Sequence, residues 1–120
     1  MSLDVYLSRK RWISYDEGKT HNEENEELYQ ANITHNLGKM AGEAGIYQHL
    51  WRPEEINITK ASELIEPLTT GLVLLKSDEK RFMKFNSPNG WGMYEHFVPF
   101  VEEYLNACKE FPDATISISR

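Results

Sequence analysis

Apolar and polar residues alternate with a period of two at both ends of the chain. Leu3, Val5 and Leu7 fall on one face of an extended segment near the start, and Ile116 and Ile118 do the same near the end. This alternation is typical of half-buried β-strands. Because an isolated strand leaves its backbone hydrogen-bonding groups unpaired, the simplest arrangement pairs the two terminal strands with each other.

The pattern becomes polar after the first strand. Residues 11–15 are a candidate third strand that extends the first one into a hairpin. Residues 16–27 contain Gly18 and many carboxylates, which predicts a mobile acidic loop. The acidic residues of this segment are Asp16, Glu17, Glu23, Glu24, Glu26 and Glu27.

Three apolar stripes with helical spacing occupy the middle of the chain. The first begins near Asn32, the second begins at a Thr59 cap and runs to about Lys76, and the third covers residues 94–108. Pro67 and Pro99 interrupt the second and third stripes without changing their phase, so each predicts one kinked helix. Short helical turns are expected over residues 46–52 and 78–85.

This order of elements predicts an α+β fold. We expect a mostly helical single domain over residues 1–120, with three main helices packed on a small sheet of two or three strands formed by the chain termini. Apolar residues make up 40% of the chain and charged residues 27%, which is ordinary for a globular domain.

Charge and targeting signals narrow the classes of partner. A net charge of −6 disfavours nonspecific nucleic-acid binding, which needs cations to neutralise phosphates. No apolar run is long enough for a membrane span, and the N-terminal residues do not resemble a signal peptide. With Cys108 as the single cysteine, we expect a cytoplasmic protein. The acidic segment is either a solvated loop or a docking surface for a basic partner.

Known catalytic spacings are missing from the sequence. There is no His-x-x-x-His pair, no cysteine pair, no Gly-x-Ser-x-Gly turn and no phosphate-binding glycine signature. Cys108 lies on the apolar stripe of the last helix, where a buried thiol is inert. We therefore expect no metal or cofactor, and the sequence favours a binding protein over an enzyme.

Polar side chains are concentrated where the first helix is expected to start. Asn32, Thr34, His35 and Asn36 offer more hydrogen-bonding groups than a helix cap needs. A second group follows that helix and a third precedes the last one, and together they could line a ligand pocket or form a buried structural network. The candidate ligand-binding residues are Asn32, Thr34, His35, Asn36, Tyr47, Arg52, Trp91, Tyr94 and Glu95.

Four segments carry a resemblance to known proteins. They are residues 32–41 (NITHNLGKMA), residues 50–54 (LWRPE), residues 89–95 (NGWGMYE) and residues 117–120 (SISR). They are similar to segments of small uncharacterised proteins of bacteriophages and bacteria, over nearly the whole chain except the acidic segment. The resemblance implies a cytoplasmic accessory protein and supplies no activity.

Three hypotheses about function follow. The first is a non-enzymatic cytoplasmic binding or interaction protein of phage or mobile-element type, which contacts a protein partner through the acidic segment or exposed aromatic residues. The second is a small-molecule-binding protein or small enzyme with a pocket near His35, Arg52, Trp91 and Glu95. The third is an acidic immunity protein or inhibitor of a basic partner. Trp12, Tyr15 and Trp51 are expected to be exposed, which leaves a homodimer open.

Overall fold

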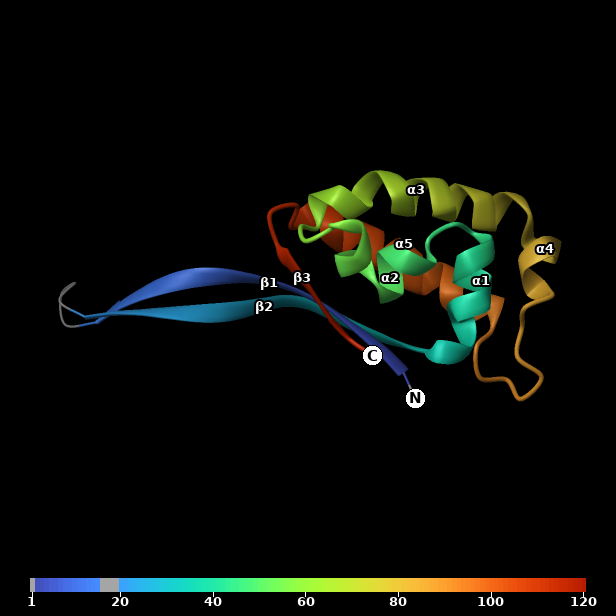
Figure 1. The fold of residues 1–120 in the computed structure, drawn as a ribbon, viewed down its shortest axis with the longest axis horizontal. Helices are drawn as coiled ribbons and strands as arrows, with labels where there is room; N and C mark the ends of the chain where they lie inside the picture. Colours follow the sequence, from blue (N-terminus) through green and yellow to red (C-terminus); the bar gives the residue numbers. More distant parts are fainter. Residues whose placement is uncertain (1, 16–19) are drawn as a thin grey trace.

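The computed structural model describes the backbone of residues 2–15 and 20–120 and the side chains of residues 2–10 and 25–120. Helices form a body at one end of the molecule, and a two-stranded ribbon projects from that body (Figure 1). The molecule measures 60 × 27 × 23 Å along its principal axes. The ribbon accounts for the long dimension (Figure 1).

The three strands of the sheet are β1 (Ser2–Tyr15), β2 (Thr20–Thr34) and β3 (Thr115–Ser119). Their order is β2-β1-β3, and both pairings are antiparallel. The two terminal strands are therefore neighbours, with Val5 opposite Ile118, as the alternation at the chain ends predicts. The prediction of an α+β fold with helices packed on a sheet of terminal strands is confirmed.

The polar segment after the first strand differs from its prediction. Residues 11–15 continue β1, and residues 20–27 form the outer half of β2, so this part of the predicted acidic loop is a strand. The rest of that loop, residues 16–19, lies outside the described residues, as do the side chains of Trp12 and Tyr15. β3 pairs with β1 only over residues 4–8, so the ribbon beyond Ser8 has two strands.

The strand β2 also replaces the predicted start of the first helix. Ile33 lies opposite Leu3, and Ala31 lies opposite Val5, so both continue the period-two alternation of a strand. Leu3, Val5 and Ile33 are buried in the core. The sequence pattern placed Ile33 on a helical stripe, because one apolar residue at a boundary fits either period. The helix expected from Asn32 instead begins after Thr34 with a 3₁₀ turn.

Helices fill the rest of the chain. Pro67 lies inside α3 and Pro99 inside α5, so each stripe forms one continuous helix across its proline, as predicted. The cap at Thr59 was wrongly predicted, because α3 begins at Ser62 and the Glu63 carboxylate accepts the Thr59 and Lys60 amides instead. The elements are η2 (His35–Leu37), α1 (Gly38–Glu43), α2 (Tyr47–Trp51), η3 (Pro53–Ile56), α3 (Ser62–Ser77), α4 (Glu79–Met83) and α5 (Tyr94–Glu110).

The core lies between the helices and one face of the sheet. Phe82, Phe97 and Tyr104 are fully buried, and the Tyr104 ring stacks on Tyr29 of β2 with ring centroids 5.9 Å apart. Cys108 is also buried, as its place on the apolar stripe predicts. Within the described part of the chain, no helix is both long and apolar enough to cross a membrane.

Candidate functional site

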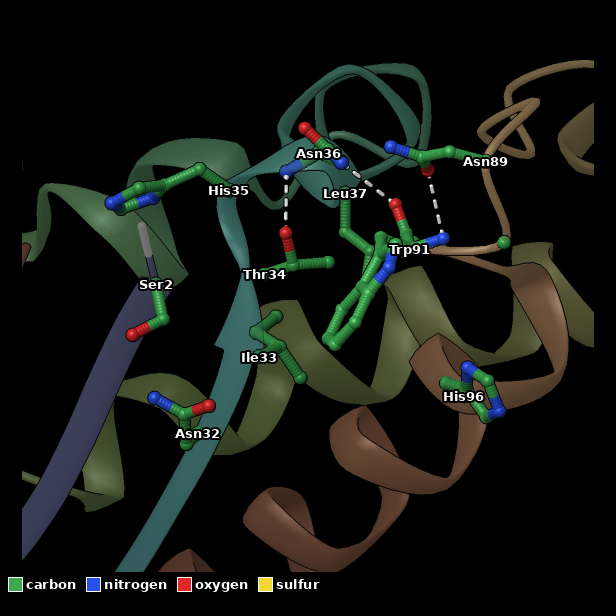
Figure 2. Close-up of a pocket in the computed structure, with 12 residues that line it drawn as sticks. Ser2, Asn32, Ile33, Thr34, His35, Asn36, Leu37, Asn89, Trp91 and His96 are labelled. Carbon is green, nitrogen blue, oxygen red and sulfur yellow. Dashed lines mark hydrogen bonds between the residues drawn. The ribbon is translucent and has the colours of Figure 1, made fainter.

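A hollow lies where the end of β2 meets the loop that precedes α5. Its volume is about 970 Å³, and we call it the junction pocket. Figure 2 shows the end of β2 and the turn η2 on one side of it, with the loop carrying Asn89 and Trp91 on the other. The lining residues are Ser2, Asn32, Ile33, Thr34, His35, Asn36, Leu37, Asn89, Gly90, Trp91, Gly92 and His96.

Trp91 is the most unusual residue of this pocket. Its side chain is 70% exposed, which is rare for so large an apolar group. The backbone beneath it is fixed, because Asn36 Nδ2 donates to the Trp91 carbonyl at 2.8 Å. Asn89 Oδ1 accepts the Trp91 amide at 2.9 Å (Figure 2). The indole is therefore presented to solvent from a loop that is held in place.

Gly92 allows the loop to approach the end of β2. Its φ is +111°, a conformation that side chains disfavour, and an added Cβ would lie 2.8 Å from the Cβ of Asn36. Thr34 caps the turn η2 by accepting the Asn36 amide at 3.3 Å. The polar cluster at residues 32–36 thus holds one wall of the pocket through Thr34 and Asn36.

His35 faces a second, smaller hollow. Trp51 Nε1 donates to His35 Nδ1 at 2.8 Å, and Figure 2 shows the imidazole turned away from Trp91. This second hollow has a volume of about 310 Å³ and is lined by His35, Tyr47, Trp51, Arg52 and Arg120. We call it the arginine pocket. Trp51, which the sequence analysis expected to be exposed, is only 2% exposed because its indole packs between His35 and Tyr47.

The structure divides the predicted site between these two hollows. Asn32, Thr34, His35, Asn36 and Trp91 line the junction pocket, whereas Tyr47 and Arg52 line the arginine pocket with His35. These residues were expected to line one pocket between the first and last helices. The division arises because β2 continues through Asn32, so that His35 and Asn36 leave the strand end in different directions.

Two predicted residues lie in neither hollow. Tyr94 holds the fold, since its hydroxyl donates to the Leu75 carbonyl at 2.7 Å and its amide donates to Asn86 Oδ1 at 2.7 Å. Burial raises the pKa of the Tyr94 hydroxyl, so it stays a donor. Glu95 is exposed on the surface of α5, beside His96.

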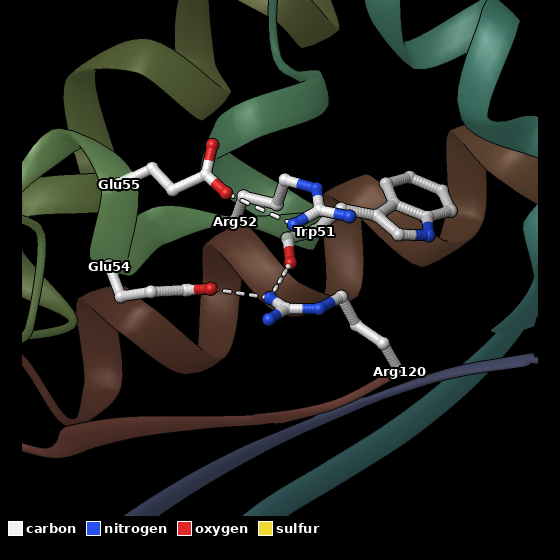
Figure 3. A network of polar contacts seen from close by, with 5 residues as sticks. All are labelled: Trp51, Arg52, Glu54, Glu55 and Arg120. Carbon is white, nitrogen blue, oxygen red and sulfur yellow. Dashed lines mark hydrogen bonds and ion pairs between the residues drawn. The ribbon is translucent and has the colours of Figure 1, made fainter.

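Arg120 and His96 are site residues that the sequence analysis did not select. Arg120 directly follows β3. Its guanidinium group donates a hydrogen bond to the Trp51 carbonyl at 2.6 Å (Figure 3). Only the β1–β3 pairing brings it to Trp51, so local patterns could not reveal it. His96 follows Glu95 on the exposed side of the first turn of α5.

Metal-binding geometry is not seen in the part of the chain that the structure describes. No group of three or more His, Cys, Asp and Glu side chains lies close enough there to hold a metal ion. Comparisons of the chain with protein-family models, with curated proteins and with solved structures found no match. The resemblance to bacteriophage proteins therefore stays a prediction, and the geometry of the two pockets supports the functional argument.

Proposed function

We propose that this protein is a binding protein that captures an extended polypeptide segment as an added strand on the outer edge of β2. The segment pairs with residues 28–34 and places an aromatic side chain in the junction pocket, against Trp91. One observation carries the proposal: an uncharged, open strand edge leads directly to an exposed tryptophan on a fixed loop.

The edge of β2 has two chemically different halves. β2 is an outer strand of the sheet, and an outer strand presents a row of backbone donors and acceptors that another strand can use. Charged side chains protect such edges, and residues 23–27 contain four glutamates. Residues 28–34 contain no charged residue. The inner half of β2 is therefore the half that favours pairing with a partner strand.

The junction pocket supplies an anchor for such a strand. In strand addition, backbone hydrogen bonds provide affinity and pockets for alternate side chains provide specificity. Asn32 and Thr34 belong both to the open edge and to the pocket wall. An aromatic side chain stacked on Trp91 gains roughly 0.5–1.5 kcal/mol beyond its buried area, and its anchoring loop needs little ordering on binding.

The negative charge of the outer half of β2 predicts the charge of the residues that flank the captured segment. A strand that pairs along residues 28–34 and continues outward passes Glu26 and Glu27. Glu26 forms an ion pair with Arg9 at 3.1 Å, whereas Glu27 is exposed. We expect basic residues in this flank. This proposal retains the basic partner that the acidic segment suggested. The contact surface is now the strand β2, where a loop was expected.

Selection from a random 12-residue peptide library displayed on phage tests the proposal. We expect enriched peptides to combine an aromatic residue with a basic flank, and to bind Trp91→Ala at least tenfold more weakly than the unmodified protein. Val73→Ala is the matched control, because Val73 is another exposed apolar residue, 64% accessible, on α3. Equal binding to the unmodified protein and to Trp91→Ala would contradict the proposal.

The same pocket also suits a small planar ligand, since it combines an aromatic wall with a few polar groups. This second candidate rests on the volume of about 970 Å³. The two candidate ligands differ in how much of the protein surface they contact. A small ligand perturbs the Trp91 and Asn36 amides alone, whereas a captured strand also perturbs the amides of residues 28–32. Backbone NMR spectra recorded with a selected peptide separate the two outcomes.

A further inference from the structure

We propose that the arginine pocket is a separate anion site that binds the phosphate group of a ligand. Its donors are the guanidinium groups of Arg52 and Arg120, the imidazole of His35 and the hydroxyl of Tyr47. His35 borders both hollows, but Trp91 and Asn36 do not line this one, so phosphate binding and strand capture can be tested separately.

The pocket brings two guanidinium groups together in an acidic protein, each of them paired with a glutamate outside the lining. The chain has a net charge of −6, yet two of its arginines, 68 positions apart in sequence, line one hollow of about 310 Å³. None of the five residues that line this hollow is acidic. Arginine is the residue best suited to phosphate, because its planar guanidinium offers two parallel donors to two phosphate oxygens.

Neighbouring carboxylates hold the two guanidinium groups in place without forming the pocket wall. Arg52 Nη1 lies 3.0 Å from Glu55 Oε2, and Arg120 Nη1 contacts both the Trp51 carbonyl and Glu54 (Figure 3). Both arginines make these contacts through Nη1, and a guanidinium has five N–H donors. Arg52 also hydrogen-bonds to the side chain of Tyr47. The N–H groups that these contacts leave over supply the donors for a phosphate. The hydrogen bond from Arg120 lowers the pKa of Glu54, which keeps this carboxylate charged and the arginine oriented.

The hydrogen bond from Trp51 determines what His35 can offer. Because Nδ1 of His35 accepts from Trp51 Nε1 at 2.8 Å, the neutral imidazole carries its hydrogen on Nε2. His35 is therefore a donor toward a ligand rather than a base. Tyr47 stacks on Trp51 with ring centroids 5.3 Å apart, and this places its phenol at the same hollow. The turn η2, the helix α2 with the Arg52 that follows it, and Arg120 thus place donors around one hollow.

Titration with inorganic phosphate, followed through the indole N–H signals, tests this proposal on the intact protein. We expect a saturable shift of the Trp51 signal, because its Nε1 bonds to a residue of the site. The Trp91 signal is the internal reference and should not move. Sodium chloride at matched ionic strength should not reproduce the shift. A Trp51 signal that does not respond to phosphate, or that responds equally to chloride, would overturn the proposal.

Further arms of the titration identify the ligand class. Phenyl phosphate binding more tightly than inorganic phosphate assigns the site to phosphate monoesters, and the reverse assigns it to the free anion. A tighter response to sodium acetate than to phosphate would overturn the assignment to phosphate.

Substitutions assign the shift to the two arginines. Arg120→Gln and Arg52→Gln should each weaken phosphate binding at least tenfold. Arg81→Gln is the matched control, because Arg81 is similarly exposed and forms an ion pair with Glu43 at 2.7 Å far from this hollow. If all three substitutions weakened phosphate binding equally, the binding would reflect general charge attraction, and the proposed site would be wrong. Arg120→Lys keeps the charge without the two-pronged geometry, so it should also bind weakly.

Discussion

Two tryptophans show how position decides what the same residue type does. Trp91 stands in solvent on the loop before α5, and Trp51 is buried between Tyr47 and His35. Trp51 was expected to be exposed and is buried, whereas Trp91, a candidate ligand-binding residue, is exposed at the junction pocket. Neither tryptophan lies within a long segment of periodic apolar residues. The hydrophobic pattern therefore could not predict whether either side chain faces the core or the solvent.

The first prediction compares the stability effects of these two residues. Trp91→Ala should change the free energy of unfolding by less than about 0.5 kcal/mol, because little of the indole is buried. Trp51→Ala should lower it by about 3–5 kcal/mol, since it leaves a cavity and removes the hydrogen bond to His35. Urea unfolding followed by circular dichroism measures both. A loss with Trp91→Ala as large as with Trp51→Ala would show that Trp91 belongs to the core.

The second prediction concerns two glycines. Gly92→Ala should lower the free energy of unfolding by roughly 1–3 kcal/mol, because its positive φ and its approach to Asn36 leave no place for a Cβ. Gly42→Ala should raise it by roughly 0.5–1 kcal/mol, because Gly42 is helical and an added Cβ meets open space. The same urea unfolding measures both, and destabilisation by Gly42→Ala would contradict the helix geometry. At Gly38, by contrast, an added Cβ would lie 3.4 Å from the Tyr47 ring.

At the scale of elements, long periodic segments were predicted well and boundaries were not. α3 and α5 follow from uninterrupted apolar stripes, and their prolines did not mislead because the phase continued. The outer half of β2 was missed because residues 20–27 are all polar or charged and carry no apolar alternation.

Candidate site residues were predicted as a set but not as an arrangement. Asn36 and Trp91 do meet, through a hydrogen bond across 55 positions of sequence. Arg52 and Trp91 do not, because the end of β2 separates their two pockets. Polar residues outside a periodic pattern indicate a special role, but only the chain path determines which of them become neighbours.

The third prediction tests the burial of Cys108 in α5. Burial raises the pKa of this thiol from 9.0 to about 12. Above the unfolded pKa the unfolded chain loses this proton while the folded protein keeps it, so stability falls as the pH rises from about 9 toward 12. The loss attributable to this group is at most about 1.4 kcal/mol per pH unit. Cys108→Ala removes it, so the stability difference between the unmodified protein and this variant should narrow at alkaline pH. A pH-independent difference would contradict the burial.

The fourth prediction tests whether the ribbon is needed for folding. Among described side chains, the buried core contains none from residues 8–32. Replacing residues 10–25 with an Asn-Gly turn, which joins the cross-strand pair Arg9 and Glu26, should therefore keep the helical body folded. We expect a change in the free energy of unfolding of less than about 1 kcal/mol. Loss of the cooperative urea transition would show that the ribbon stabilises the body.

At the scale of the whole molecule, the fold separates a compact body from an extended edge. Helices cover one face of the sheet, and β2 leaves its outer edge without a strand partner in the described sheet (Figure 1). A two-stranded ribbon is marginally stable by itself in water, so a third strand adds stability as well as contact. The shape of the molecule thus favours recognition by strand pairing over recognition by a deep cleft.

Amide hydrogen exchange of β2 tests the strand-capture proposal most directly. With a selected peptide bound, alternate amides of residues 28–34 should become protected, because their outward N–H groups donate to the added strand. The same peptide should give no protection in Trp91→Ala at equal concentration. Protection confined to the loop around Trp91, with residues 28–34 unchanged, would contradict strand capture.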